Sequence, residues 1–269
     1  MMIDSRGEIT RVQPGLTGRA ALITGGTRGI GRQVARHLLE SGARVVISGR
    51  DVEVGRTSAK ELSDYGEVKY IPADVCRRDE VDALVDRAFE HFGRLDIAIL
   101  NAGGVKSPSP VAEMSDEEWQ YELDLNLNHT FWGIRRSLRY MIPQRSGRIV
   151  AMSSVEGKHG KARIAGYVAN KHAINGLIKS VAKEVGPDGI TVNAVCPGLV
   201  DTDMLRERAG AGLGLNGAEE VMALYGREAA LGRVVTLAEV GAVTAFLVSD
   251  LAAGVTGALV SVDGGTAAY

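Results

Sequence analysis

Short apolar runs recur along the chain, and longer stretches of mixed polarity separate them. The runs are AALIT (20–24), RVVIS (44–48), VKYIP (68–72), LDIAIL (95–100), RIVAMS (148–153), ITVNAV (190–195) and GALVSV (257–262). Because their apolar residues are largely continuous rather than alternating, we expect strands that are buried on both faces, as in a parallel sheet.

The stretches between the runs predict helices over 29–42, 52–64, 77–92, 115–143, 165–186 and 236–249. A helix between two parallel strands forms a right-handed crossover. The sequence therefore predicts the α/β class, with one Rossmann-like, doubly wound parallel sheet of about seven strands and helices on both faces.

Two segments lie outside this alternation. Residues 1–16 contain acidic residues, Gly and Pro without an apolar core of signal length, which predicts a flexible leader before a single domain of residues 17–269. Residues 203–232 are rich in Gly and Ala and carry scattered charges. Long connections of this kind are usually functional, so we expect a helical lid over 203–232.

A glycine-rich turn, TGGTRGIG (24–31), follows the first run and opens the first predicted helix. Gly25, Gly29 and Gly31 have the spacing G-x-x-x-G-x-G rather than G-x-G-x-x-G. Such a turn lets the backbone approach a pyrophosphate, whose charge meets free N–H groups and the positive end of the helix dipole. In its strand–turn–helix setting, the turn predicts a dinucleotide site.

The end of the second run indicates which dinucleotide binds. An NAD site has an acid about 20 residues after the glycine turn, and this chain has Gly49 and then Arg50. A carboxylate repels a ribose 2'-phosphate, whereas a guanidinium pairs with it in a fork geometry. Arg28 in the glycine turn is a second cation for that phosphate. Each arginine alone is a common surface residue; together, with the acid missing, they predict NADP(H).

Tyr167 and Lys171 in GYVANKHA (166–173) lie four residues apart on one face of a predicted helix. A nearby ammonium stabilises the ionised form of a phenol, so we expect Lys171 to lower the pKa of Tyr167. Such a pair is also common on helix surfaces.

Ser153 ends the fifth run and Ser154 follows it, at the carboxyl edge of the sheet, where ligands bind. Since side chains alternate along a strand, at most one of the two serines faces the crevice.

Taken together, these motifs resemble the short-chain dehydrogenase/reductase family over residues 17–265. The matching segments are TGGTRGIG, ADV (73–75), NAGG (101–104), LNLNHTF (125–131), SS (153–154), YVANK (167–171), VNAVCPGLVDT (192–202) and VDGG (262–265). In that family the catalytic serine precedes the tyrosine by thirteen residues, which favours Ser154. The resemblance also implies that Asn126 is the fourth catalytic residue, ordering water toward Lys171.

The resemblance implies the cofactor contacts as well. Asp74 would lie by the adenine, Asn101 would form the cofactor wall, and Thr202 would bind the carboxamide. The full expected set is Thr24, Gly25, Thr27, Arg28, Gly29, Ile30, Gly31, Arg50, Asp74, Val75, Asn101, Ala102, Gly103, Tyr167, Lys171, Pro197, Gly198, Val200 and Thr202. Lys171 would hold the ribose hydroxyls, and Tyr167 would exchange a proton with the substrate oxygen while Ser154 binds that oxygen.

Several other residues receive no chemical role. His129 is expected to be a satisfied structural histidine, Trp119 and Trp132 to fill core or subunit contacts, and Cys196 to be a small buried residue. The basic run KHGKAR (158–163) is expected on a loop near the active-site mouth. It is either a solvated loop or a contact for an anionic carrier such as phosphopantetheine or coenzyme A.

Composition narrows the functional classes. The chain has 269 residues, 45% hydrophobic and 24% charged, with a formal net charge of -2, so we expect neither nucleic-acid nor membrane binding. Its two cysteines have neither CxxC spacing nor a flanking His cluster, which argues against disulfides and a metal site. We expect a cytoplasmic protein with reduced thiols.

The leading hypothesis is an NADPH-dependent ketone reductase that forms a secondary alcohol, with a substrate of the 3-oxoacyl-thioester or polyketide type, free or on coenzyme A or acyl carrier protein. The alternative is an NAD(P)-dependent alcohol dehydrogenase that oxidises a cyclic or steroid-like alcohol. A remote alternative is a noncatalytic cofactor sensor, which the presence of all four catalytic residues disfavours. The resemblance further implies a homotetramer built through helices 115–143 and 165–186.

Overall fold

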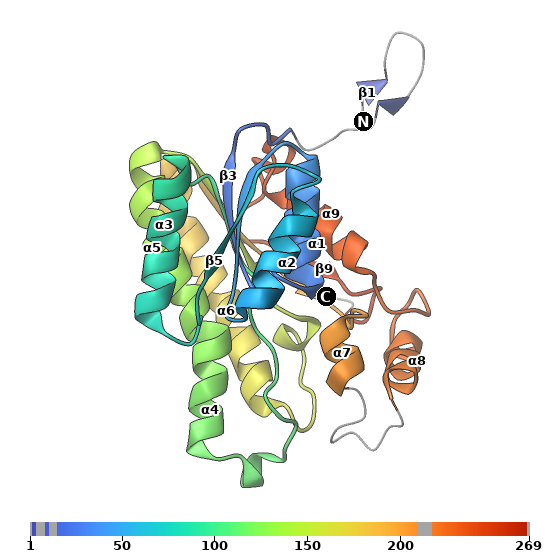
Figure 1. Ribbon diagram of the computed structural model, residues 1–269. Helices are drawn as coiled ribbons and strands as arrows, with labels where there is room; N and C mark the ends of the chain where they lie inside the picture. Colours follow the sequence, from blue (N-terminus) through green and yellow to red (C-terminus); the bar gives the residue numbers. More distant parts are fainter. Residues whose placement is uncertain (1, 4–8, 11–14, 209–216, 268–269) are drawn as a thin grey trace.

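Seven parallel strands form the centre of the fold (Figure 1). The computed structural model describes residues 2–3, 9–10, 15–208 and 217–267. In spatial order the strands are β5 (Val68–Pro72), β4 (Arg44–Gly49), β3 (Ala20–Thr24), β6 (Ile97–Leu100), β7 (Gly147–Met152), β8 (Ile190–Pro197) and β9 (Leu259–Val262). Every predicted apolar run is therefore a strand, and the predicted fold class is confirmed.

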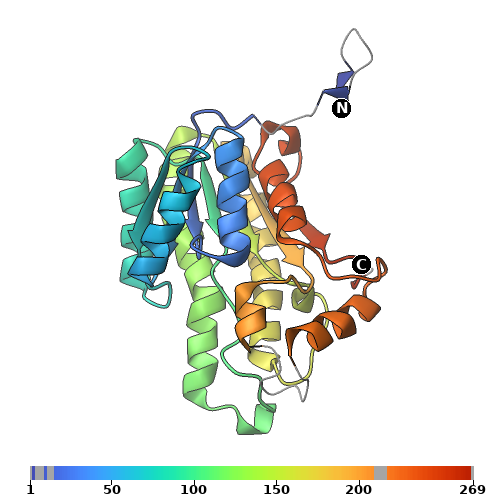
Figure 2. The same ribbon diagram turned by 45° about the vertical axis from the view of Figure 1, so that its right-hand side comes forward.

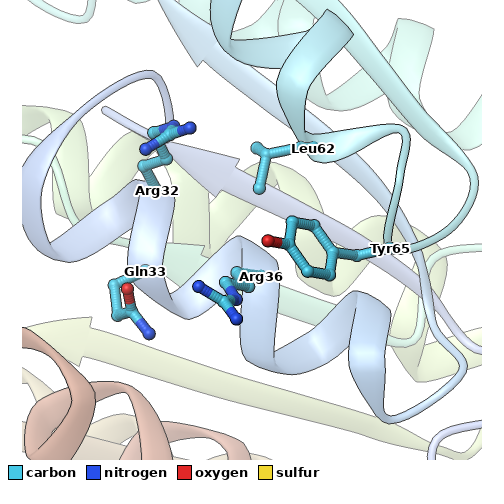
Figure 3. A pocket seen from close by; sticks show the side chains of 5 residues that line it. All are labelled: Arg32, Gln33, Arg36, Leu62 and Tyr65. Carbon is cyan, nitrogen blue, oxygen red and sulfur yellow. The ribbon is translucent and has the colours of Figure 1, made fainter.

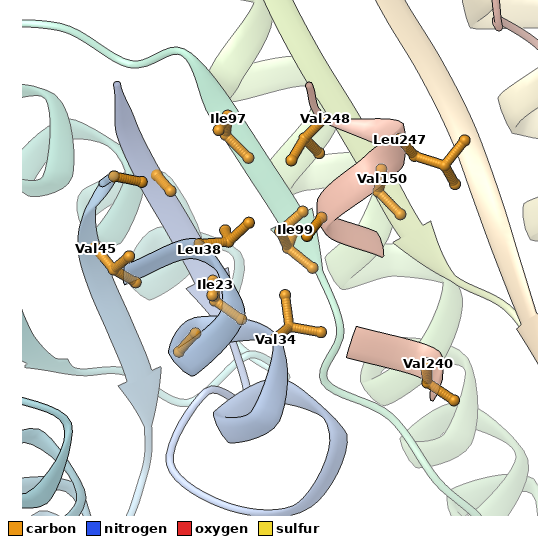
Figure 4. Packing of buried hydrophobic residues seen from close by; sticks show 14 of the residues in the cluster. Ile23, Val34, Leu38, Val45, Ile97, Ile99, Val150, Val240, Leu247 and Val248 are labelled. Atoms are coloured by element: carbon orange, nitrogen blue, oxygen red, sulfur yellow. The ribbon is translucent and has the colours of Figure 1, made fainter. Parts of the chain in front are cut away.

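Helices cover both faces of the sheet (Figures 1 and 2). On one face lie α1 (Gly29–Glu40), α2 (Val52–Leu62) and α9 (Leu237–Leu247); on the other lie α3 (Arg78–Phe92), α5 (His129–Gln144) and α6 (Ala165–Val185). Figure 4 shows the hydrophobic core on the α1 side of the sheet, here called the first core, where Val34 and Leu38 of α1 lie close to Ile23 and Ile99 of the central strands. Val240 of α9 belongs to the same cluster. Burial on both faces explains why the inner strands have continuous apolar sequences.

The helix expected over 115–143 is present as an unbroken run of helical residues from 116 to 144. It consists of α4 (Asp116–Leu123), a π-helical turn (Asp124–Asn128) and α5. The side-chain amide of Asn126 donates to the Glu122 carbonyl at 2.9 Å, competing with the main-chain bond of a regular helix. Such turns are frequent at functional sites, and this one holds a predicted catalytic residue.

The two segments outside the alternation contain short elements. Within 1–16, β1 (Met2–Ile3) pairs antiparallel with β2 (Ile9–Thr10). Within 203–232 lie α7 (Asp203–Arg208) and α8 (Ala218–Glu228). Residues 1, 4–8 and 11–14 of the expected leader and residues 209–216 of the expected lid lie outside the described residues.

The chain leaves β3 in one direction across the sheet and returns through β6 in the other, so the sheet has a topological switch point between these two strands. Ligands of open α/β sheets bind outside the carboxyl ends of the strands at such a point. Helices α4, α7 and α8 extend past that end of the sheet in both views (Figures 1 and 2). The fold thus places the predicted site residues at one edge.

Candidate active site

The glycine turn approaches its neighbours too closely for a larger residue. Gly25 and Gly29 have φ angles of 62° and 54°, in the left-handed region that favours glycine. A Cβ at Gly31 would lie 2.2 Å from the Gly25 carbonyl oxygen. The first turn of α1 carries no acidic residue, so no carboxylate of that turn neutralises the positive end of its helix dipole. This cradle fits a pyrophosphate.

A neutral hydrogen-bond network ties the glycine turn to the end of β6. The side-chain amide of Asn101 donates to the carbonyls of Thr24 and Gly25, both at 3.0 Å, while the main-chain N–H of Asn101 donates to Thr24 Oγ1 at 2.9 Å. Ala102 N also donates to Thr24 Oγ1, at 3.2 Å. The network fixes the wall on one side of the crevice.

His129 belongs to this network. It is fully buried, with Nδ1 2.8 Å from the Leu125 carbonyl and Nε2 3.3 Å from Thr24 Oγ1. Burial, together with the nearby Lys171 ammonium, lowers the pKa of His129 to about 4. The histidine is neutral and satisfied, so the expectation of a structural histidine is confirmed.

Arg50 lies beyond the end of β4, and Tyr121 of α4 holds it. The hydrogen bond from Arg50 to the Tyr121 side chain raises the pKa of the guanidinium, with Asp74 and Cys76 nearby. A Cβ at Gly49 would lie 2.8 Å from Thr27 Oγ1. Thr27 therefore occupies the space that a ribose-binding acid at position 49 would need.

The remaining predicted cofactor residues line the same edge. Asp74 Oδ1 accepts from Cys76 N at 3.0 Å, which closes the turn after β5, and Val75 is buried. Beyond β8, the Gly198 N–H donates to the Val262 carbonyl at 3.0 Å. Thr202 lies across from the glycine turn, with its methyl group 3.7 Å from where a Cβ at Gly29 would be. Pro197 ends β8, Val200 is buried, and Ile30 packs partly buried against the first core.

The predicted catalytic side chains converge at the end of β7. Ser154 follows the strand and hydrogen-bonds the phenol of Tyr167, whereas Ser153 turns toward α6 and donates to Asn175 Oδ1 at 2.7 Å. Lys171 Nζ lies 5.3 Å from the centre of the Tyr167 ring and donates to the Met152 carbonyl at 2.7 Å. Of the two serines, Ser154 is the one beside the tyrosine.

Asn126 reaches the same place from the π-helical turn. Its side chain accepts from Gly104 N and donates to the Gly104 carbonyl, both at 3.0 Å. A Cβ at Gly103 would lie 2.7 Å from Asn126 Oδ1 and 3.3 Å from Lys171 Nζ. Gly103 thus lets Asn126 and Lys171 approach each other.

The expected lowering of the Tyr167 pKa is wrong for this structure. Burial of the phenol raises its pKa, and the Glu156 and Glu122 carboxylates raise it further. Burial also lowers the pKa of Lys171 to about 8. The reason is desolvation, which disfavours both charged forms and outweighs the attraction expected from a lysine four residues away.

Sequence reasoning missed two acidic residues near the tyrosine. Glu156 is 8% exposed and accepts a hydrogen bond from Ser154 Oγ. Glu122 is 1% exposed; its Oε1 accepts from Lys106 N at 2.9 Å, and burial raises its pKa. The only signal for Glu156 was its place two residues after Ser154, and Glu122 gave none, because α4 looks like a solvated acidic helix.

The basic run is less available to ligands than its composition indicates. Lys158 Nζ donates to Ser261 Oγ at 2.8 Å, inside the fold. Lys161 Nζ lies 4.1 Å from the centre of the Tyr225 ring and 3.5 Å from Glu228 Oε2, both on α8. Cys196 is buried, as expected, whereas Trp119 is 43% exposed and lies outside the core.

A separate pocket lies between α1 and α2 (Figure 3), away from the catalytic side chains. It is lined by Arg32, Gln33, Arg36, Leu62 and Tyr65 and encloses about 60 Å³. Its arginines pair with Glu61 and Glu40, at 2.6 and 2.8 Å. Ligand sites usually exceed about 300 Å³, so the pocket is too small for a cofactor. Its arginines are also already paired with glutamates, so their charges are neutralised.

Among the described residues, no helix has the length and apolar character needed to cross a membrane. No group of three or more His, Cys, Asp or Glu side chains within the described ranges is arranged to hold a metal ion.

Comparison with known proteins places this arrangement in a family. The family described as enoyl-(acyl carrier protein) reductase matches residues 25–267. The chain is 38% identical to the 3-oxoacyl-[acyl-carrier-protein] reductase FabG of Chlamydia muridarum, covering 94% of this chain and 98% of that one. It is 35% identical to the 3beta-hydroxysteroid dehydrogenase 2 of Eggerthella lenta, over 96% and 98%.

Solved structures agree with the sequence relatives. A crystal structure of actinorhodin polyketide ketoreductase with NADPH superposes with a TM-score of 0.88 at 36% identity, over 93% of this chain and 98% of that chain. Levodione reductase gives a TM-score of 0.88 at 34% identity, over 94% and 99%. The chain belongs to the short-chain dehydrogenase/reductase family.

Proposed function

We propose that this protein is an NADPH-dependent reductase that converts a ketone into a secondary alcohol. The observation that carries the proposal is the convergence of Ser154, Tyr167 and Lys171 at the end of β7, beside the glycine cradle of α1. Tyr167 in its protonated form is an acid placed to give its proton to a carbonyl oxygen, which suits reduction.

The nicotinamide, when bound, supplies the hydride to the carbonyl carbon. The protein's part is to hold the carbonyl oxygen and protonate it. Tyr167 donates its phenolic proton to that oxygen, and Ser154 donates a hydrogen bond to it as negative charge develops. Lys171 holds the ribose hydroxyls, and Asn126 orders water that leads from Lys171 toward solvent. In alcohol oxidation the proton moves the opposite way.

The cofactor residues follow from the cradle. The glycine turn, with Thr24, Gly25, Thr27, Gly29, Ile30 and Gly31, receives the pyrophosphate, and the neutral wall of Asn101, Ala102 and Gly103 lies beside it. Asp74 and Val75 flank the adenine. Pro197, Gly198, Val200 and Thr202 cover the nicotinamide. Arg28 and Arg50 bind the ribose 2'-phosphate.

Substitution of Arg50 tests the choice of NADPH over NADH. Arg50→Ala removes a guanidinium that forms charge-assisted bonds to phosphate, each contributing roughly 1.5–3 kcal/mol. We expect the KM for NADPH to rise by about tenfold or more while the KM for NADH stays within about twofold. Equal effects on both cofactors in steady-state assays would contradict the assignment of Arg50 to the phosphate.

The substrate class we propose is a 3-oxoacyl or polyketide-type ketone, free or bound to coenzyme A or acyl carrier protein. The similarity to the FabG reductase and to the polyketide ketoreductase supports it. Oxidation of a cyclic or steroid-like alcohol is the second candidate, supported by the similarity to the hydroxysteroid dehydrogenase.

We also infer that residues 203–232 form a lid over the substrate site. They would belong to a single domain of residues 17–269, which follows a leader of residues 1–16.

A ketone panel separates these candidates. NADPH oxidation is measured with cyclic diketones, steroid ketones and 3-oxoacyl thioesters, in parallel with NADH and with the reverse reactions. Tyr167→Phe is expected to lower kcat by about 10²–10⁴-fold, the usual contribution of a positioned acid. Unchanged turnover of every accepted ketone in this variant would refute the proposed mechanism.

We also infer a homotetramer built through α4, α5 and α6. Trp119 on α4 and Phe131 on α5 are 43% and 42% exposed, which is typical of side chains that a partner subunit covers. Light scattering coupled to size exclusion is expected to give four chains for the unsubstituted protein and a smaller species for Trp119→Glu.

Because Cys76 and Cys196 are both free thiols, we further infer a cytoplasmic location, which cell fractionation tests.

A further inference from the structure

Glu156 is a buried carboxylate beside the catalytic serine, and the function proposed above gives it no role. It lies in the 3-10 turn Val155–Gly157 and is 8% exposed. Asn175 of α6 secures this turn by donating to the Gly157 carbonyl at 2.8 Å. A Cβ at Gly157 would lie 2.8 Å from Asn175 Nδ2. The turn is therefore closely packed against α6, and the direction of the Glu156 side chain is fixed.

The contact between Glu156 and Ser154 is reciprocal. Ser154 Oγ donates to Glu156 Oε2, and the Glu156 main-chain N–H donates to Ser154 Oγ at 3.2 Å. A serine hydroxyl has one proton, and a carboxylate can only accept hydrogen bonds. Without a ketone in the site, Glu156 accepts that proton and so competes with the Tyr167 phenol, to which a hydrogen bond from Ser154 would lower the pKa. A ketone oxygen that enters the site competes with Glu156 for the same proton.

We propose that Glu156 is a positioning residue, which orients the Ser154 hydroxyl and keeps Tyr167 protonated between turnovers, so that the enzyme favours ketone reduction over alcohol oxidation near neutral pH. The proposal rests on the function proposed above, because it assigns Tyr167 the role of proton donor. It adds a third group to the serine–tyrosine pair and gives that group a directional effect on the reaction.

The charges around Tyr167 are consistent with this role. Glu156 and Glu122 both raise the pKa of the phenol, one from the turn after β7 and the other from α4, while the Ser154 hydrogen bond lowers it and Cys196 of β8 raises it. Glu156 also faces Lys171 of α6 and Tyr225 of α8. Of the two carboxylates, Glu156 is the one hydrogen-bonded to a catalytic side chain.

Two substitutions separate the charge of Glu156 from its hydrogen bond. Glu156→Gln removes the charge and keeps an oxygen that can accept from Ser154, whereas Glu156→Ala removes both. Loss of a negative charge lets the phenol ionise at lower pH. In the glutamine variant we expect the alkaline limb of ketone reduction and the acid limb of alcohol oxidation to move down by about one pH unit, a tenfold change in the ionised fraction. The alanine variant is expected to show the same shift and a several-fold lower kcat.

Glu113→Gln is the matched control, because Glu113 is exposed and lies outside the site. It is expected to leave both pH profiles unchanged. Thermal unfolding of all variants detects a purely structural role, which would lower the melting temperature without moving the profiles. A pH profile of Glu156→Gln that coincides with that of the unsubstituted enzyme would overturn the proposal.

A measurement without turnover keeps this test distinct from the test of the proposed function. The ultraviolet absorbance of ionised tyrosine is recorded against pH with NADP⁺ added, and the Tyr167→Phe signal is subtracted. If Glu156 acts as proposed, Tyr167 ionises at lower pH in Glu156→Gln than in the unsubstituted protein, even if no ketone in the panel is reduced. An unmoved titration overturns the role of Glu156 while leaving the ketone reductase proposal intact.

Discussion

The two sides of the crevice are built on different physical principles. On the cofactor side, Thr24, Asn101 and His129 form a neutral network in which each polar atom described above has a partner. On the substrate side, Glu156 and Lys171 are buried charged groups close to the Tyr167 phenol. Around the glycine turn, the cofactor side depends on close packing and fixed shape, whereas the surroundings of Tyr167 on the substrate side depend on charge. Added bulk should therefore damage the first, and changes of charge should retune the second.

Gly31→Ala gives the largest expected effect. The added methyl group would lie 2.2 Å from the Gly25 carbonyl oxygen, so the glycine turn must move and the cradle is lost. We expect NADPH affinity to fall by more than about 100-fold, as measured by quenching or enhancement of NADPH fluorescence. Gly160→Ala on the substrate side is the control, because nothing lies within 4 Å of a Cβ there. Similar losses in both variants would contradict the contrast between the two sides.

His129→Gln gives an intermediate effect and concerns acid stability. The pKa of His129 is about 4 in the folded protein, against a reference value of 6.5. Between these values the unfolded chain binds a proton that the folded protein does not, so acidification favours unfolding by about 3 kcal/mol over the whole interval. Denaturant unfolding from pH 7 to pH 4 should show this loss in the unsubstituted protein. Glutamine does not titrate, so between pH 7 and pH 4 the variant should lose about 3 kcal/mol less unfolding free energy than the unsubstituted protein. Equal losses in the two proteins would contradict the lowered pKa of His129.

Lys161→Met gives the smallest effect and tests the substrate side. Lys161 joins the loop before α6 to α8 through the Tyr225 ring and Glu228. A partly exposed contact of this kind contributes about 1 kcal/mol, so we expect the KM for the ketone to rise by roughly fivefold or less with little change in kcat. The effect should shrink at high salt. Lys60→Met, at an exposed position of α2, is the control. An equal or larger change there would show that the contact of Lys161 with Tyr225 and Glu228 has no specific role.

The strands could be predicted because a strand that is buried on both faces has a continuous apolar sequence. The run RIVAMS became β7 and ITVNAV became β8, within two residues at each end. The glycine turn was also readable, because Gly25 and Gly31 are needed by local backbone geometry. The helix over 115–143 was also readable, but its π-helical turn was not, because periodicity cannot reveal that the side-chain amide of Asn126 binds the Glu122 carbonyl.

The sequence alone determined the order of strands and helices, the place of the glycine turn, and the spacing of Ser154, Tyr167 and Lys171, since these depend on local pattern and on residues near one another in the chain. The tertiary structure decided the electrostatics. Whether Lys171 or burial controls the phenol depends on how much water is excluded, and whether Glu156 or Glu122 lies near it depends on how β7, α4 and α6 pack. Desolvation and through-space charge act between residues that the fold brings together, and for that reason the pKa of Tyr167 could not be read from a four-residue spacing.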